Sequence, residues 1–151
     1  MADSSAPGCV LLVEDNADDE ELMRLAFESG NIMNRLVVVR DGVEALDFLF
    51  RTGPHSERDS DFWPQLVLLD LKLPKVSGLD VLRRIRSDER TRTLPVVVLT
   101  SSKQDEDVVR SYELGANAYV RKPVEFGEFL EAAKQLGMFW LMINQPPPHP
   151  R

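Results

Sequence analysis

Acidic side chains follow two apolar runs of this sequence, each at the point where the run ends. Asp70 follows residues 66–69, and Glu14 and Asp15 follow Cys9–Val13. A short apolar run bounded by turn residues is typical of a buried parallel strand. In an open parallel sheet, reactive groups gather outside the carboxyl ends of the strands. We therefore expect these three carboxylates to lie close together at one edge of a sheet.

Two further polar residues lie at strand ends: Thr100 is the last residue of the strand expected at 95–100, and Lys122 follows the strand expected at 118–121. Carboxylates that are packed together repel, since at ~4 Å and an effective dielectric constant of ~20 each pair costs about 4 kcal/mol. A hard cation would offset this repulsion, and Mg²⁺ typically binds one or two carboxylates while bridging to a phosphate. Lys122 could then neutralise one phosphoryl oxygen, and the Thr100 hydroxyl could donate to another. This pattern indicates that Asp70 is a phosphoryl acceptor.

Each of these residues also has an ordinary structural explanation. Taken alone, Asp70 is typical of a turn former, and Glu14 and Asp15 are typical of helix-capping acids. Thr100 alone suits a structural role, and Lys122 alone suits a solvated surface charge. Their joint placement at one edge is what favours the functional interpretation.

Apolar runs alternate with helical patterns along the whole chain. Strands are expected at 9–13, 36–39, 66–70, 95–100 and 118–121. Asn16, Asp41 and Ser77 suit the starts of the first three helices, and a fourth helix is expected at 105–114. The last helix carries an apolar stripe from Phe126 to Trp140. This alternation predicts right-handed βαβ units and one parallel sheet that is covered on both faces.

The composition predicts a soluble globular chain. The 151 residues are 43% hydrophobic and 28% charged, which suits one domain with a substantial core. The net charge of −7 argues against a nucleic-acid partner. We expect no membrane association, because the sequence has neither a signal-peptide pattern nor an apolar stretch of about 20 residues. The single cysteine, Cys9, fits a core position in a reducing compartment, so we expect a cytoplasmic protein.

Four stretches resemble the signatures of the CheY-like receiver domain of response regulators. They occur in the family's order and spacing at residues 13–16, 69–74 with Gly78, 99–101 and 115–123. The resemblance implies an α/β, flavodoxin-like, three-layer (βα)5 fold with a five-stranded parallel sheet in the order 2-1-3-4-5. We expect a disordered N-terminus at 1–8, the receiver domain at 9–136, and at 137–151 an extension of the last helix with a proline-rich end.

The resemblance also implies a function. A stand-alone regulator of this kind would accept a phosphoryl group on Asp70 from a sensor histidine kinase or a phosphotransfer protein. It would catalyse only its own phosphorylation and dephosphorylation, and it would signal through a changed protein-interaction surface. The implied Mg²⁺ ligands are carboxylates and one backbone carbonyl: Asp15, Asp70, the carbonyl of Lys72, and Glu14 through a water.

The same resemblance assigns Thr100 and Lys122 to the phosphoryl group. Tyr119 is expected to follow Thr100 inward and to change the face formed by the fourth helix, fifth strand and fifth helix. The Lys122–Pro123 bond is expected to be cis, a form that is accessible only before proline. Lys72 departs from many members of the family, and a cation there could interact with the phosphoryl group or with Glu14 and change the rate of hydrolysis.

Three alternatives use parts of the same pattern. A Mg²⁺-dependent phosphohydrolase of the haloacid dehalogenase type also uses a strand-end aspartate, but it needs a second aspartate where Lys72 stands. A flavin carrier of the same fold needs a loop rich in Ser, Thr or Gly where residues 14–19 are mostly acidic. A pseudo-receiver that acts only as a scaffold is disfavoured because the set of site residues is complete.

Two segments bear on the partners of the chain. The long loop at 52–64, the Asn-containing approach to the second strand and the apolar C-terminus are similar to phytochrome-associated response regulators, which pair with light-sensing histidine kinases. Residues 138–143 are apolar in an unbroken run, so the tail either folds back on its own domain or forms an interface. We expect a homodimer contact built from the tail and the last helix: Phe129, Phe139, Trp140 and Ile143.

Overall fold

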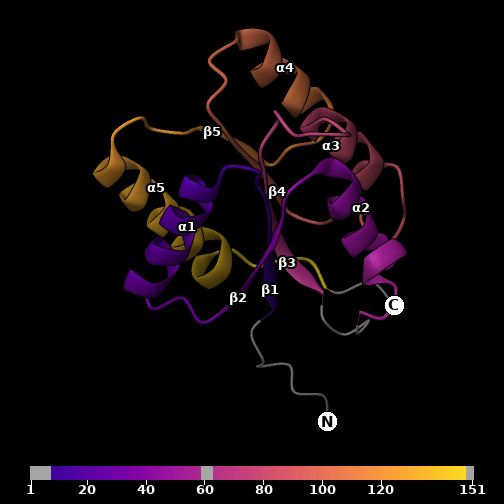
Figure 1. Cartoon of the computed structure of the whole chain (residues 1–151), viewed down its shortest axis with the longest axis horizontal. Helices are drawn as coiled ribbons and strands as arrows, with labels where there is room; N and C mark the ends of the chain where they lie inside the picture. Colours follow the sequence, from indigo (N-terminus) through magenta and orange to yellow (C-terminus); the bar gives the residue numbers. More distant parts are fainter. Residues whose placement is uncertain (1–7, 59–62, 149–151) are drawn as a thin grey trace.

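The computed structural model describes residues 8–58 and 63–148, and its elements follow the predicted alternation (Figure 1). The strands are β1 (Cys9–Val13), β2 (Arg35–Val39), β3 (Pro64–Leu69), β4 (Val96–Thr100) and β5 (Ala118–Arg121). The α-helices are α1 (Ala17–Ser29), α2 (Gly42–Phe50), α3 (Gly78–Arg86), α4 (Asp105–Glu113) and α5 (Phe126–Met138). A short 3-10 turn, η1 (Gly53–His55), follows α2, and a π-helical segment, η2 (Phe139–Ile143), continues α5. Within the described ranges, no helix is both long enough and apolar enough to cross a bilayer.

The five strands are all parallel and lie in the order β2-β1-β3-β4-β5, as predicted. Figure 1 shows α1 and α5 side by side on one face of the sheet, and α2, α3 and α4 follow one another on the other. The fold is therefore the expected three-layer receiver architecture. It brings the carboxyl ends of β1, β3, β4 and β5 to the same edge.

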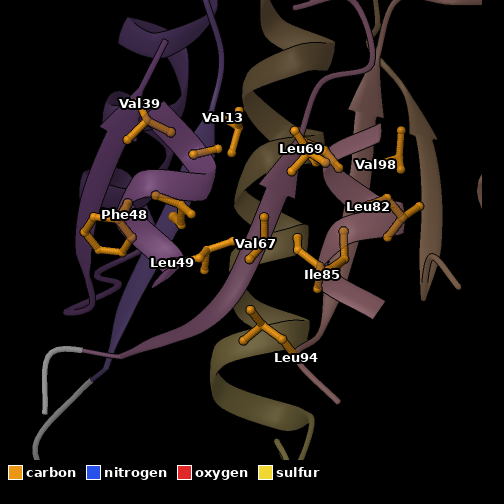
Figure 2. Packing of buried hydrophobic residues seen from close by; sticks show 14 of the residues in the cluster. Val13, Val39, Phe48, Leu49, Val67, Leu69, Leu82, Ile85, Leu94 and Val98 are labelled. Atoms are coloured by element: carbon orange, nitrogen blue, oxygen red, sulfur yellow. The ribbon is translucent and has the colours of Figure 1, made fainter. Parts of the chain in front are cut away.

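Each face of the sheet has its own apolar core. Alternate side chains of β3 point into one core and then into the other. Val67 and Leu69 belong to the core beneath α2 and α3, whereas Leu66 and Leu68 belong to the core beneath α1 and α5. Figure 2 shows Leu82 of α3 packed near Leu69 in the first of these cores. All five side chains are fully buried, and burial of a leucine side chain stabilises the fold by about 1.5–3 kcal/mol. The two cores hold the sheet as a rigid base for its carboxyl edge.

The helices next to this edge begin at the predicted residues. The Asn16 side chain accepts a hydrogen bond from the backbone N–H of Asp19 at 2.9 Å, which starts α1. The Asp41 side chain accepts from the backbone N–H of Glu44 at 2.7 Å, which starts α2. Ser77 caps α3 in the same manner. Each cap contributes about 1 kcal/mol and fixes where the helix meets the edge of the sheet.

Two glycines allow backbone segments to approach closely beside this edge. A Cβ atom on Gly78 would lie 2.2 Å from the carbonyl oxygen of Asp70, and a Cβ atom on Gly42 would lie 2.1 Å from that of Val76. Because both obstructing atoms belong to the backbone, neither contact can be relieved by a rotamer change. Glycine at these positions is therefore what lets α3 begin so near the end of β3 and α2 begin against the loop between β3 and α3.

Arg86, the last residue of α3, binds the segments that lead into β4 and β5. Its Nε donates to the carbonyl of Gly115 at 2.9 Å, and its Nη1 donates to the carbonyl of Leu94 at 2.8 Å. Its Nη2 donates to Asn117 Oδ1 at 3.0 Å, and the same oxygen accepts from the backbone N–H of Val96 at 2.8 Å. The amino ends of β4 and β5 are thus joined to the end of α3.

The long loop between α2 and β3 lies against α2 in its described part. Arg58 Nε donates to the carbonyl of Phe48 at 2.8 Å, and its guanidinium lies 4.5 Å from the centroid of the Phe48 ring. The His55 ring meets the same ring edge-on at 5.4 Å. Residues 59–62 of this loop lie outside the described residues, as do residues 1–7 of the predicted disordered N-terminus.

The C-terminal segment folds back in part on its own domain. Trp140 and Leu141 pack against the core on the α1 and α5 side. Phe129 is 4% exposed and belongs to that core, so its predicted role as a dimer contact is wrong: its helical phase points it at the sheet. Phe139 and Ile143 are 46% and 70% exposed. The apolar surface that the tail leaves in solvent is therefore carried by η2.

Candidate functional site

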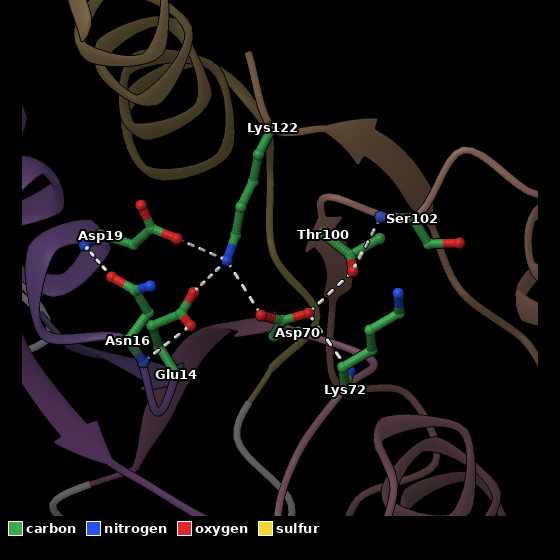
Figure 3. Close-up of polar contacts among 8 residues, drawn as sticks. All are labelled: Glu14, Asn16, Asp19, Asp70, Lys72, Thr100, Ser102 and Lys122. Carbon is green, nitrogen blue, oxygen red and sulfur yellow. Dashed lines mark hydrogen bonds and ion pairs between the residues drawn. The ribbon is translucent and has the colours of Figure 1, made fainter. Parts of the chain in front are cut away.

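The predicted edge of the sheet holds a compact polar cluster centred on Asp70 (Figure 3). Asp70 directly follows β3 and is 6% exposed. Its Oδ1 accepts a hydrogen bond from Thr100 Oγ1 at 2.7 Å and a longer one from the backbone N–H of Lys72 at 3.3 Å. Its Oδ2 accepts from Lys122 Nζ at 2.9 Å. Both carboxylate oxygens are thus oriented, Oδ1 by Thr100 at the end of β4 and by the backbone after β3, and Oδ2 by Lys122 beyond β5.

Lys122, just beyond β5, reaches across the edge to three carboxylates. Its Nζ lies 2.6 Å from Glu14 Oε1, 2.8 Å from Asp19 Oδ2 and 2.9 Å from Asp70 Oδ2. The lysine side chain is only 8% exposed, so these are ion pairs shielded from water. The ammonium therefore offsets the mutual repulsion of the acids that the sequence placed at this edge.

Glu14 and Asp15 follow β1 and differ in their surroundings. Glu14 is 2% exposed, and its Oε2 accepts from the backbone N–H of Asn16 at 3.1 Å. Asp15 is exposed. Glu14, Asp15 and Asp70 each offer an oxygen atom, and these atoms lie within 4.8 Å of one another. Such a set of hard oxygen donors fits a divalent cation of the Mg²⁺ type.

Burial and neighbouring charges oppose each other in setting the protonation of the cluster. Burial acts to raise the pKa of Asp70, but the charge and hydrogen bond of Lys122 and the hydrogen bond of Thr100 outweigh it and lower this pKa. At Glu14 burial prevails and raises the pKa to about 7. Burial also acts to lower the pKa of Lys122, but the hydrogen bonds that its ammonium donates to Asp19 and Glu14 raise it. Asp70 is thus an anion and Lys122 a cation at neutral pH.

Thr100 connects the cluster to α4 and β5. The backbone N–H of Ser102 donates to Thr100 Oγ1 at 3.4 Å, and the Ser102 hydroxyl donates to Asp107 of α4. The Tyr119 hydroxyl donates to the carbonyl of Ser102 at 3.3 Å. A change in the position of Thr100 can therefore be transmitted through Ser102 to Asp107 at the start of α4 and to the Tyr119 side chain of β5.

The structure brings most of the predicted site residues together. Asp70, Glu14, Asp15, Thr100 and Lys122 form one cluster, and Tyr119 reaches it only through Ser102. The side chain of Lys72 is exposed, and Figure 3 shows it extending on the Thr100 side of Asp70, away from Glu14.

One prediction about this cluster is wrong. The Lys122–Pro123 bond is trans, since the described residues contain no cis peptide bond. The trans form is intrinsically favoured even before proline, and the Lys122 ammonium reaches its three carboxylates with the bond in that form.

Sequence reasoning missed Asp19 and Ser102 as members of the cluster. Asp19 is one of three acids in the first turn of α1, a position that suits the helix dipole whether or not the residue belongs to a site. A sequence signal existed, because Asp19 lies four residues after Asp15 and therefore one helical turn from the site. Ser102 follows Thr100 by two residues, which places its amide beside the threonine hydroxyl.

Residues 10–134 match the response regulator receiver domain, and the chain belongs to that family. It is therefore a signalling protein, and its family implies a histidine kinase or a phosphotransfer protein as partner and a divalent metal at the acidic site. The haloacid dehalogenase alternative has no support.

The relatives include regulators that are associated with phytochromes. Rcp1 of Synechocystis sp. is 37% identical over 139 residues, which are 92% of each chain. A crystal structure of the phosphorylated cyanobacterial phytochrome response regulator RcpA has a TM-score of 0.88 at 36% identity and covers 95% of this chain and 100% of that one. The bacteriophytochrome response regulator AtBRR is 51% identical, with a TM-score of 0.73 and coverages of 93% and 99%. The predicted likeness to phytochrome-associated regulators is confirmed.

Proposed function

We propose that Asp70 is the residue of this receiver that becomes phosphorylated. An Asp70 carboxylate oxygen attacks the phosphorus atom of a phosphohistidine, the new P–O bond forms, and the P–N bond breaks with its electron pair leaving on the imidazole. The observation that carries the proposal is the pair of bonds from Thr100 and Lys122 to opposite oxygens of a buried, ionised Asp70. A carboxylate held in this way is a preorganised nucleophile.

The acidic residues around Asp70 would hold a divalent cation, which we propose to be Mg²⁺. Asp15 and Asp70 would be direct ligands together with the backbone carbonyl of Lys72, and Glu14 would contribute through a water. When bound, the cation supplies positive charge to the carboxylates and to the phosphoryl oxygens. The shared position of the three carboxylates supports this assignment, as does the existence of a Mn²⁺-bound form of Rcp1.

Lys122 and Thr100 would stabilise the transferred group. The Lys122 ammonium already points at Asp70 Oδ2, so a phosphoryl group added there meets a positive charge. The Thr100 hydroxyl, now bonded to Asp70 Oδ1, would turn its donor to a phosphoryl oxygen. We propose that this shift, passed through Ser102 to α4 and Tyr119, changes the interaction surface and constitutes the output.

The assignment of Asp70 is tested with acetyl phosphate as a small-molecule donor. The protein is incubated with acetyl phosphate and Mg²⁺ and run on a phosphate-affinity gel beside Asp70→Asn and Asp80→Asn. Asp80 is an exposed aspartate of α3 and serves as the matched control. We expect a retarded band in the parent and in Asp80→Asn, and none in Asp70→Asn. A parent protein that is not retarded, or an Asp70→Asn variant that still is, would refute the assignment.

We propose a phytochrome-type histidine kinase as the phosphoryl donor in the cell. The support is the likeness to RcpA, Rcp1 and AtBRR over nearly the whole chain. The test is a time course of phosphotransfer from a radiolabelled phytochrome-type kinase, compared with an unrelated histidine kinase at the same concentration. Preferential transfer from the phytochrome-type kinase is expected, and equal or slower transfer from it contradicts this partner.

We also propose that the chain forms a homodimer through η2. The exposed apolar side chains of this segment support the proposal, namely Phe139, Met142 and Ile143, and the exposed Met138 at the end of α5 adjoins them. Trp140 is half-buried against its own domain and would lie at the margin of such a contact.

Sedimentation of a Phe139→Ser and Ile143→Ser double variant tests the dimer. Met33→Ser, which removes an 80% exposed apolar side chain from the loop between α1 and β2, is the control. We expect the double variant to be monomeric at concentrations at which the parent and the control are dimeric. A monomeric parent, or a double variant that is still a dimer, removes the proposal.

A further inference from the structure

We propose that Asp19 is a positioning residue, which holds the Lys122 ammonium on the α1 side of the site and thereby slows the phosphorylation of Asp70. The inference rests on the proposed function of Asp70 as phosphoryl acceptor. It assigns a role in that reaction to a residue of α1 that stands outside the proposed metal ligands.

The geometry around Lys122 leaves its ammonium fully engaged. An ammonium group has three N–H donors, and Glu14, Asp19 and Asp70 each accept one, at 2.6, 2.8 and 2.9 Å. The side chain of Asp19 is 23% exposed and that of Lys122 is 8% exposed, so the contact is largely shielded from water. A phosphoryl oxygen that approaches Asp70 must therefore compete for a donor that is already in use.

Asp19 is well placed to act as a fixed anchor. It lies in the first turn of α1, where its backbone N–H is bound by the Asn16 side chain at 2.9 Å. Because the Asn16 side chain caps the helix through the backbone N–H of Asp19, the Asp19 carboxylate takes no part in this hydrogen bond and is available to Lys122. Figure 3 shows this carboxylate and that of Asp70 on opposite sides of the ammonium.

The three carboxylates that bind Lys122 differ in what becomes of their charge during the reaction. Glu14 and Asp70 are proposed to share their charge with the cation, and Asp70 is neutralised further as its new bond to phosphorus forms. Asp19 keeps its full charge throughout. It therefore draws the ammonium away from the phosphoryl oxygens and weakens the stabilisation that the ammonium can give them.

The test compares Asp19→Asn with Asp18→Asn. Asp18 is an exposed acid in the same turn of α1, so its variant loses the same charge and the same interaction with the helix dipole. Each protein is mixed with acetyl phosphate and Mg²⁺, and the rate of formation of the Asp70 phosphate is measured. In this reaction the Asp70–phosphorus bond forms as the phosphorus–oxygen bond to acetate breaks, with the electron pair leaving on acetate.

We expect Asp19→Asn to be phosphorylated about three- to tenfold faster than Asp18→Asn, because one negative charge beside the ammonium is lost. Asp18→Asn should match the parent to within about twofold, since an exposed charge is screened by solvent. An Asp19→Asn rate equal to or below that of Asp18→Asn overturns the inference while leaving Asp70 as acceptor. A parent that is not phosphorylated on Asp70 overturns both.

A spectroscopic readout separates positioning from a general effect on the fold. The ammonium protons of Lys122, held by three carboxylates, should exchange slowly enough for a ¹H–¹⁵N signal, which is assigned by its loss in Lys122→Arg. We expect this signal to shift or broaden in Asp19→Asn and to be unchanged in Asp18→Asn, with both variants folded at the temperature of the measurement. A Lys122 signal that is the same in both variants would overturn the assigned contact.

Discussion

Replacing Lys122 with methionine removes the ammonium that lies among Glu14, Asp19 and Asp70. Methionine keeps most of the length and apolar volume of the stem, so the change acts chiefly on charge. Without the ammonium, the nearly buried carboxylates of Glu14 and Asp70 face each other with no compensating cation. The variant should therefore be less stable than the parent when divalent metal is absent.

The size of the effect follows from the burial of the partners. The side chains of Lys122, Glu14 and Asp70 are 8%, 3% and 8% exposed, and removal of one partner of a buried ion pair costs about 3–5 kcal/mol. In the parent, burial raises the pKa of Glu14 to about 7 although Lys122 lowers it, so without the ammonium this pKa rises further. Glu14 then takes up a proton more readily as the pH falls, which relieves part of the repulsion. We expect Lys122→Met to lower the free energy of unfolding by about 3 kcal/mol at about pH 8, near the lower end of that range, and by less at about pH 6.

Urea unfolding followed by circular dichroism measures the loss at both pH values, once with a chelator and once with Mg²⁺. Lys103→Met, which removes an exposed lysine from the segment between β4 and α4, is the control. Mg²⁺ should narrow the difference between Lys122→Met and the control, because the bound cation replaces the missing charge. A Lys122→Met variant as stable as Lys103→Met in chelator would refute the electrostatic account, as would a deficit that Mg²⁺ leaves unchanged.

Three further predictions concern other parts of the molecule. Burial raises the pKa of Glu14 to about 7, so protons compete with the metal ion for this site below about pH 7. The Mg²⁺ affinity, measured by calorimetry, should therefore rise between about pH 6 and pH 8. An affinity that does not change with pH would contradict this. Gly78→Ala should lower stability by about 3 kcal/mol or more, since its Cβ would lie 2.2 Å from the carbonyl oxygen of Asp70. In Gly127→Ala the Cβ would meet only the Glu125 carboxylate, at 3.2 Å, so that variant should lose much less stability than Gly78→Ala; equal melting shifts would count against the close-approach argument. Burial raises the pKa of Cys9 to about 11, so its thiol should resist a thiol reagent at neutral pH until urea unfolds the chain, and rapid labelling of the native protein would contradict this.

The fold and the centre of the site were predictable because they depend on local patterns. A run of apolar residues marks a strand, and its last residue marks the carboxyl edge of the sheet, so Asp70 and Glu14 could be placed without knowledge of long-range contacts. The caps at Asn16 and Asp41 were predictable for the same reason, since a cap involves residues only a few positions apart.

The features that were missed depend on how the elements are rotated against one another. Asp19 meets Lys122 only because α1 and the segment after β5 lie over the same edge, and no local pattern records that rotation. Phe129 was assigned to an interface, but the phase of α5 turns it into the core. In η2 the turn widens to π geometry, which the regular helical stripe does not anticipate.

The hydrogen bonds of the Arg86 guanidinium hold the amino ends of β4 and β5 more firmly than their carboxyl ends. This guanidinium joins α3 to the residues that lead into β4 and β5, on the side of the sheet away from Asp70. Thr100 and Tyr119 could therefore move while the amino ends of β4 and β5 stay bound to Arg86. Such a movement would not require the two apolar cores to open. Hydrogen exchange should follow the same gradient, with the amides at the start of β4 most protected and those beyond its carboxyl end least protected. A signal arising at Asp70 would on this view be confined to one side of the molecule.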